Sequence, residues 1–147
     1  MLALGQQYGM GLQLINILRD AGTDLRAGRC YFPGDELAAV ALTPAQILQQ
    51  PERFLPVYTK WLDKAERGVA AGTQYSLALR NSRVRAATVL PALIGQRTLE
   101  LLRDTGATVL HGTIKVPRSE VRAMIATLAI TLAAKSQIER MFHRGAL

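Results

Sequence analysis

Two aspartates four positions apart, Asp20 and Asp24, are the residues of this sequence best suited to chemistry. On a helix, side chains at positions i and i+4 share one face, so the two carboxylates would repel each other. They also fall near an expected helix end, where the helix dipole disfavours anions. Mg²⁺ would relieve both penalties, because it binds one or two carboxylates together with substrate phosphates. The pair predicts a magnesium site, and an exposed helix end with hydrated aspartates is the alternative.

Arginines and a tyrosine follow the aspartates closely in the sequence, at Arg26, Arg29 and Tyr31. A guanidinium group binds phosphate through two parallel hydrogen bonds. A tyrosine hydroxyl can donate to a phosphate oxygen. Carboxylates, then arginines, then a tyrosine is therefore an order that suits a metal-bridged diphosphate site. Each arginine taken alone also fits a solvated loop charge.

The aspartates belong to a helix expected from residue 2 to about residue 24. Leucine and isoleucine occupy most of its circumference, including Leu14, Ile15 and Leu18. Its polar residues are confined to a narrow stripe. Such a pattern predicts a helix among other helices, with the stripe facing an interior cavity or a missing partner and the three apolar residues packed inside. The stripe spans roughly 80° of arc at 100° per residue and consists of Gln6, Gly9, Gln13, Asn16, Asp20 and Asp24.

The rest of the chain also predicts helices, and the fold class expected is an all-α helical bundle. Hydrophobic residues make up 49% of the sequence, and no internal repeat or low-complexity linker divides it, so residues 1–147 are expected to form a single unit. A loop is expected over residues 105–118. The further expected helices are 36–40, 44–50 after a Thr43 cap, 52–79, 84–104 with a kink at Pro91, and 119–143 after a Ser119 cap.

The net charge of +7 indicates an anionic partner or membrane surface. The basic residues are spread over every segment and do not alternate with aromatics, which argues against nucleic acid. Cys30 is the only cysteine, so no internal disulfide is expected and the default compartment is the cytoplasm. The apolar stretch 124–134 is shorter than the ~20 residues that cross a bilayer. Peripheral membrane contact is left open.

The stretch from Gly9 to Pro33 resembles the second aspartate-rich signature of the squalene/phytoene synthase family. One departure is Thr23, where the family often has glutamate. Residues 83–87 and 90–99 resemble the family's later helices more loosely. The resemblance rests on Gln13, Asn16, Arg19, Asp20, Asp24, Arg29, Tyr31 and Pro33.

The resemblance implies part of an isoprenoid-synthase (terpenoid synthase) fold and a head-to-head condensation of two prenyl diphosphates. Farnesyl diphosphate, leading to squalene, is the favoured substrate, and geranylgeranyl diphosphate, leading to phytoene, is the alternative. The implied cofactors are Mg²⁺, for which Mn²⁺ could substitute, and NADPH if squalene is the product. The implied metal ligands are Asp20 and Asp24, which are also catalytic together with Tyr31. The implied substrate-binding residues are Gln13, Asn16, Arg19 and Arg29.

The family also has a first aspartate-rich motif on an earlier helix, and this sequence contains none. Glu100 and Asp104 do not replace it, and are expected to be solvated charges near Arg97 and Arg103. The chain is therefore expected to be a carboxyl-terminal half that is inactive alone. It would need a complementing amino-terminal half, or form homo-oligomers through uncovered apolar surface. A non-catalytic helical remnant or interaction module is the alternative.

Overall fold

Regular structure in this protein is helical wherever the chain is described. The computed structural model describes the backbone of residues 1–112 and 114–144, and the side chains of residues 1–112 and 114–131. Within these ranges there is no strand, which confirms the all-α prediction. The elements are α1 (Leu2–Arg26), α2 (Gly34–Ala39), the 3₁₀ turn η1 (Pro44–Gln46), α3 (Pro51–Leu77), α4 (Ser82–Thr105), the 3₁₀ helix η2 (Gly106–His111) and α5 (Arg118–Arg144).

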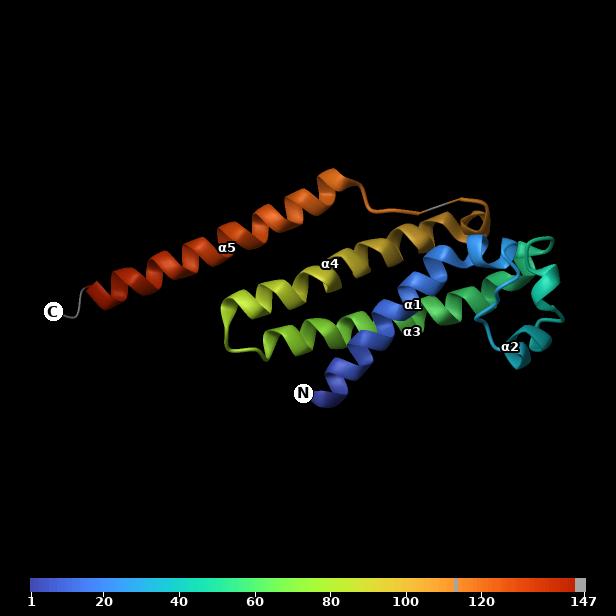
Figure 1. Cartoon of the computed structure of the whole chain (residues 1–147), viewed down its shortest axis with the longest axis horizontal. Coiled ribbons are helices and arrows are strands. Elements are labelled where there is room, and N and C mark those ends of the chain that lie inside the picture. Colours follow the sequence, from blue (N-terminus) through green and yellow to red (C-terminus); the bar gives the residue numbers. More distant parts are fainter. Residues whose placement is uncertain (113, 145–147) are drawn as a thin grey trace.

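Helices α1, α3 and α4 form the body of the molecule (Figure 1). Helices α3 and α4 run antiparallel and are joined by a short turn, while α1 packs mainly on α3 and less extensively on α4. Helix α2 and η1 lie at the end of the body away from that turn. Helix α5 runs back along α4 and projects past the turn (Figure 1). Its first turn is tied to α4 by Arg97, whose Nε donates to Glu120 at 2.7 Å.

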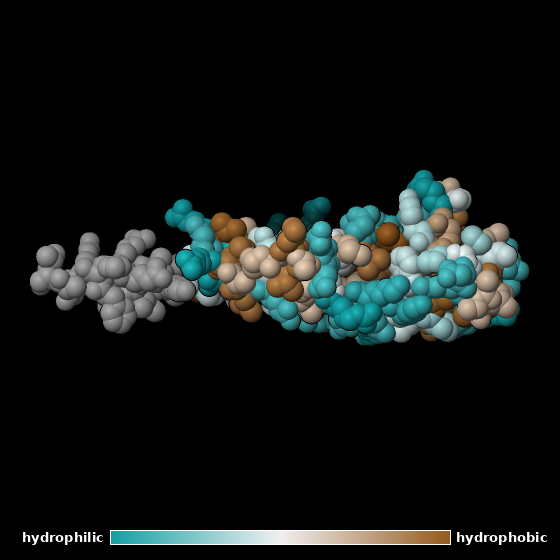
Figure 2. Space-filling view, turned by 90° about the horizontal axis from the view of Figure 1, so that it is seen from below, coloured by the Kyte–Doolittle hydropathy of each residue, from teal (hydrophilic) through white to brown (hydrophobic). Residues whose placement is uncertain are grey.

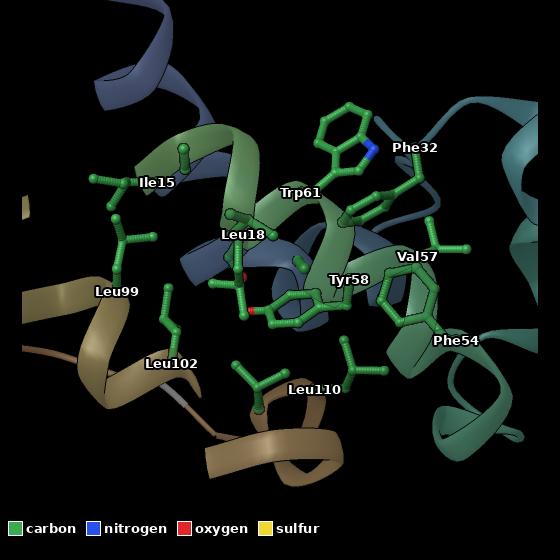
Figure 3. Packing of buried hydrophobic residues seen from close by; sticks show 14 of the residues in the cluster. Ile15, Leu18, Phe32, Phe54, Val57, Tyr58, Trp61, Leu99, Leu102 and Leu110 are labelled. Carbon is green, nitrogen blue, oxygen red and sulfur yellow. The ribbon is translucent and has the colours of Figure 1, made fainter. Parts of the chain in front are cut away.

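Aromatic side chains of α3 form the centre of the core (Figure 3). The ring of Phe32, from the loop after α1, stands edge-on to Phe54 at 4.7 Å and lies 5.0 Å from Trp61. The hydroxyl of buried Tyr58 donates to the carbonyl of Leu18 at 3.1 Å, and burial raises its pKa. Because Leu18 is itself fully buried, α3 fixes the half of α1 that carries the aspartates.

A pair of glycines lets α1 and α3 touch backbone to backbone. A Cβ added to Gly11 would lie 2.7 Å from the Cα of Gly68, and one added to Gly68 would lie 2.5 Å from the Cα of Gly11. Real Cβ atoms essentially never approach so closely, so neither position accepts a larger residue without moving a helix. The two glycines therefore set the separation of the helices at their crossing.

The 3₁₀ helix η2 holds the far end of α1. Gly22 faces the backbone of Leu110 with no room for a Cβ, and the Nη1 of Arg26 donates to the Leu110 carbonyl at 2.8 Å. Val109 and Leu110 are buried. The prediction of a loop over residues 105–118 was therefore wrong for this segment, because two apolar side chains anchor a helical turn on the core.

Several helix boundaries differ from the predicted ones. The helix expected over 44–50 is only the turn η1, closed by Thr43 and Gln46, whose side chain accepts from the Thr43 amide at 2.9 Å. Helix α4 begins earlier than expected, because the side chain of Asn81 caps it by accepting from two backbone amides. It is continuous through Pro91. Helix α5 begins at Arg118, before the expected Ser119 cap.

A half-buried carboxylate joins α2 to α3. Glu36 accepts from the indole of Trp61 at 3.0 Å and pairs with Lys60 at 3.0 Å and with Lys64 at 3.6 Å. These contacts, with Lys60 first, lower the pKa of Glu36. A carboxyl whose folded pKa is depressed stabilises the fold above its unfolded pKa, about 4.3. That contribution is lost as the pH falls through the lower folded value.

We therefore expect Glu36→Gln to destabilise the protein at pH 7, and the difference from wild type to shrink as the pH falls below about 4. Urea unfolding of both proteins between pH 7 and pH 3 measures it. Exposed Glu52, which forms no ion pair in the described chain, supplies the control variant Glu52→Gln. A difference between wild type and Glu36→Gln that stays constant across this range would contradict the expectation.

Candidate functional site

The first aspartate of the pair is bound to its own neighbour. Arg19 donates from Nε and Nη2 to the two carboxylate oxygens of Asp20, at 2.9 and 2.8 Å. This bond is the main reason that the pKa of Asp20 lies below its usual range, and the charge of Lys115 contributes to the same shift. The Asp20 side chain is 42% exposed. It is therefore an ionised carboxylate that a ligand can reach.

The second aspartate is bound by an arginine from the following loop. Arg29 donates from Nε and Nη2 to Oδ1 of Asp24, at 3.1 and 2.8 Å, and its backbone amide donates to the Asp24 carbonyl at 2.8 Å. The loop thus folds back over the end of α1. The Asp24 side chain is 16% exposed, whereas that of Arg29 is 56% exposed. Both arginines that the resemblance implies as substrate-binding residues thus contact the predicted metal ligands.

The polar stripe of α1 lies on the outside of the described chain. Gln13 and Asn16 are exposed, so no interior cavity of these residues encloses them. The physical reason is that α3 and α4 cover only one side of α1. Ile15 and Leu18 are buried as predicted, while Leu14 is half-buried at the edge of the core. A partner that covers the stripe stays a prediction.

An open hollow of about 530 Å³ lies beside Asp20, between α1, α4 and the segment that leads into α5. Ligand pockets in proteins commonly measure about 300–1,000 Å³. Three cations and one carboxylate line it, on Arg19, Asp20, Lys115 and Arg118. Apolar side chains line the remainder together with Thr98, and these are Ile94, Ile114, Val116 and Val121. The hollow thus joins a charged rim to an apolar wall.

A larger hollow, of about 730 Å³, lies between α3 and α4 and is less suited to bind an anion. Its two arginines are already neutralised. Arg97 pairs with Glu100 and Glu120, and Arg103 pairs with Asp63 and Glu66. Glu100 is therefore an ion-paired surface charge, in agreement with the sequence analysis. We favour the smaller hollow as the candidate site, because a net positive charge surrounds it.

Two carboxylates are the donor set available for a metal ion. Mg²⁺ suits such a set only when phosphate oxygens and waters complete its octahedral shell. The described residues contain no cluster of three or more His, Cys, Asp or Glu side chains that could hold a metal. Oδ2 of Asp24 makes no hydrogen bond in the described chain, whereas both oxygens of Asp20 are bonded to Arg19. The residues fit a magnesium ion that arrives with a phosphate ligand.

Sequence reasoning missed two residues of this site, Lys115 and Arg118. They follow Asp20 by almost a hundred positions and lie in the segment between η2 and the start of α5. Their only signal was that they are basic and flank Pro117. Tyr31, in contrast, is 51% exposed and does not line the hollow.

Comparison with known proteins shows which family this chain belongs to. An all-helical body with an aspartate-bearing helix against α3 and α4 is part of an isoprenoid-synthase fold. The family model described as squalene/phytoene synthase matches residues 1–120, and the chain belongs to that family.

Several curated relatives are similar to this chain, each over a small part of the relative's own length. A bifunctional lycopene cyclase/phytoene synthase of Gibberella fujikuroi is 33% identical over 122 residues, covering 80% of this chain and 20% of the relative. Its counterpart from Arthroderma gypseum is 27% identical over 119 residues, with the same coverage. Chloroplastic phytoene synthase 1 of Arabidopsis thaliana is 40% identical over 81 residues, covering 49% and 18%. The chain thus spans about a fifth of the length of these relatives.

Proposed function

We propose that this chain supplies the second aspartate motif of a diphosphate site in a head-to-head prenyltransferase of the phytoene synthase type. The observation that carries the proposal is the hollow beside Asp20, where Lys115 and Arg118 from a distant segment join the motif. The names of the relatives favour phytoene synthase over squalene synthase, in contrast to the preference drawn from the sequence. Geranylgeranyl diphosphate is accordingly the proposed substrate.

The residues around the hollow divide the work between the two parts of a prenyl diphosphate. Arg19, Lys115 and Arg118 offer charged donors to phosphate oxygens, and such hydrogen bonds are shorter and stronger than neutral ones. Ile94 and Val121 present apolar surface to the first prenyl carbons and keep water from them. The cations would also stabilise the negative charge that grows on the diphosphate as it leaves.

Asp20 and Asp24 are the residues that would hold Mg²⁺. When bound, the ion supplies Lewis-acid stabilisation of the leaving diphosphate. Arg19 and Arg29 orient the two carboxylates, so their oxygens are presented without rearrangement of α1. Gln13 and Asn16, two turns and one turn before Asp20, stay proposed as residues that orient the metal, water or substrate.

Pyrophosphate tests the cationic rim directly. We expect Lys115→Glu and Arg118→Glu each to weaken pyrophosphate binding by the 147-residue chain at least tenfold in the presence of Mg²⁺. The reason is that a hydrogen bond to a charged group contributes about 1.5–3 kcal/mol, and the new carboxylate adds repulsion. Isothermal titration calorimetry measures the affinity.

Arg53→Glu is the matched control, because Arg53 is exposed in the first turn of α3, does not line the hollow and donates from its side chain to Gln50. It should bind pyrophosphate like wild type. Asp20→Asn should remove the part of the affinity that depends on Mg²⁺. If both rim variants bind as tightly as the Arg53 control, the hollow is not the diphosphate site.

A non-catalytic helical module is the second candidate function. It is favoured by the pairing of both aspartates with arginines and by the lack of a third metal ligand among the described side chains. The two candidates differ in one measurable property. A prenyltransferase site should bind pyrophosphate more tightly with Mg²⁺ than without it, whereas a remnant should bind equally with and without the ion.

A further inference from the structure

Among the residues whose side chains the structure describes, the end of the body that contains the α3–α4 turn carries no acidic residue. Between Glu66 and Glu100 the sequence has no aspartate or glutamate, and the arginines nearest the turn are Arg80, Arg83 and Arg85. The first half of α1 reaches this end, since the hydroxyl of Tyr8 donates to the carbonyl of Thr88 at 2.8 Å. No charged side chain precedes Arg19 in the sequence. The described side chains at the turn end therefore carry only positive charge.

Two aliphatic side chains stand exposed beside these arginines. Leu77 is 67% exposed at the end of α3, and Val84 is 47% exposed in the first turn of α4. Between them, Arg80 and Arg83 are exposed and form no ion pair in the described chain. Figure 2 shows hydrophobic and hydrophilic residues side by side at this end of the molecule.

The backbone holds this arrangement in place. Arg85 donates from Nε and Nη2 to the carbonyl of Leu79, at 3.0 and 2.6 Å, so its guanidinium closes the end of α3. Asn81 caps α4 by accepting from the amides of Arg83 and Val84. The turn is thus fixed by its own hydrogen bonds, which leaves Leu77, Arg80, Arg83 and Val84 pointing outward as a defined surface. We call these four residues the turn surface.

We propose that the turn surface docks on an anionic lipid bilayer. Each cation near such a surface adds to the attraction by anionic headgroups. Leu77 and Val84 would enter the interfacial region while Arg80 and Arg83 contact lipid phosphates, as amphipathic side chains do at membrane interfaces. No helix of the described chain is long and apolar enough to cross a bilayer, so the contact is interfacial.

The same residues suit nucleic acid less well. Single strands bind where aromatic side chains stack on bases, and the turn surface contains two aliphatic residues instead. Exposed leucine and valine gain nothing from a phosphate backbone, whereas lipid removes them from water. The inference does not rest on the proposed function, because the turn surface and the Asp20 hollow lie at opposite ends of α1. From Gly5 to Asp20 that helix rises about 22 Å.

Flotation with lipid vesicles tests the docking. The 147-residue chain should float with phosphatidylcholine vesicles that contain phosphatidylglycerol, and not with pure phosphatidylcholine. Arg80→Glu with Arg83→Glu should lower vesicle affinity at least tenfold, because two attractive charges become repulsive. The matched control, Arg53→Glu with Arg67→Glu, makes the same change in net charge at exposed positions away from the turn and should retain most of the affinity.

Two further measurements distinguish docking through the turn surface from attraction by net charge alone and from RNA binding. An environment-sensitive fluorophore on L77C, in a C30S background, should shift to the blue with anionic vesicles, whereas the same label on R53C should not. L77S with V84S should weaken vesicle binding without changing the circular dichroism spectrum. Equal loss of binding in the two charge-reversal pairs would overturn the proposal, as would a label at position 77 that stays in water. Tighter binding of single-stranded RNA than of anionic vesicles would overturn it too.

Discussion

Gly68→Ala is expected to destabilise the protein by about 1–3 kcal/mol or more, the usual cost of overpacking a core. The added methyl group would meet the Cα of Gly11 and the carbonyl oxygen of Gln7, at 2.5 and 2.8 Å. Both are backbone atoms, so no side chain can rotate away and α1 must shift as a body. Since domains are stable by only about 5–15 kcal/mol, the change should be plain in urea unfolding. Gly11→Ala should behave similarly.

Gly9 provides a control on the same helix. A Cβ at Gly9 would meet nothing within 4 Å. Gly9→Ala should therefore stabilise the protein, because alanine is better than glycine in a helix by about 1 kcal/mol. The same propensity gain is present in Gly68→Ala, so the difference between the two variants isolates the crossing. Equal stabilities for the two would mean that the helices are not in backbone contact there.

The 147-residue chain, assayed alone, is expected to form no hydrocarbon from geranylgeranyl or farnesyl diphosphate with Mg²⁺, whether or not NADPH is added. The family pattern implies metals held between two opposing aspartate motifs, and this sequence carries one. Mg²⁺ dehydrates reluctantly and seldom relies on one carboxylate pair alone. Product extraction and chromatography measure the turnover, and a complete phytoene synthase serves as the positive control.

Hydrocarbon product that vanishes in Asp20→Asn would contradict this expectation and establish the chain as a self-sufficient enzyme. Product that persists in Asp20→Asn would instead point to a contaminating synthase. Sedimentation of the same samples addresses the uncovered side of α1, where Met10 is 66% exposed. We expect self-association there, or capture of an amino-terminal half supplied separately, because apolar patches of this kind tend to be covered.

The long helices were predictable because their apolar residues recur with helical period. Helix α1 ends two residues after the predicted end, and α3 begins one residue and ends two residues before the predicted bounds. The short elements were not predictable from period. The capping box of Thr43 predicts a helix, but the helix stops after one 3₁₀ turn. Val109 and Leu110 are too short an apolar run to indicate η2.

The candidate site was predictable only where its residues are neighbours in sequence. The exposure of Asn16 could not be predicted, because it depends on how much of α1 the other helices cover. The contribution of Lys115 could not be predicted either, since the path of the chain from η2 to α5 decides it. The roles assigned to Asp20, Asp24, Tyr31 and the other site residues stay predictions, to be tested by the variants above.

The bond between Arg26 and the Leu110 carbonyl has a consequence for biosynthesis. The two residues are 84 positions apart, so a ribosome adding 5–20 residues per second needs roughly 4–17 s between them. During those seconds α1 has left the ribosome without the segment that closes over Gly22. Helix α3 can already cover most of α1, but the end of α1 around Gly22 is then open to other nascent chains. The supply of chaperones and the codon usage between α1 and η2 should therefore affect the yield of this protein. Their effect on yield should exceed that of the stability of the folded protein.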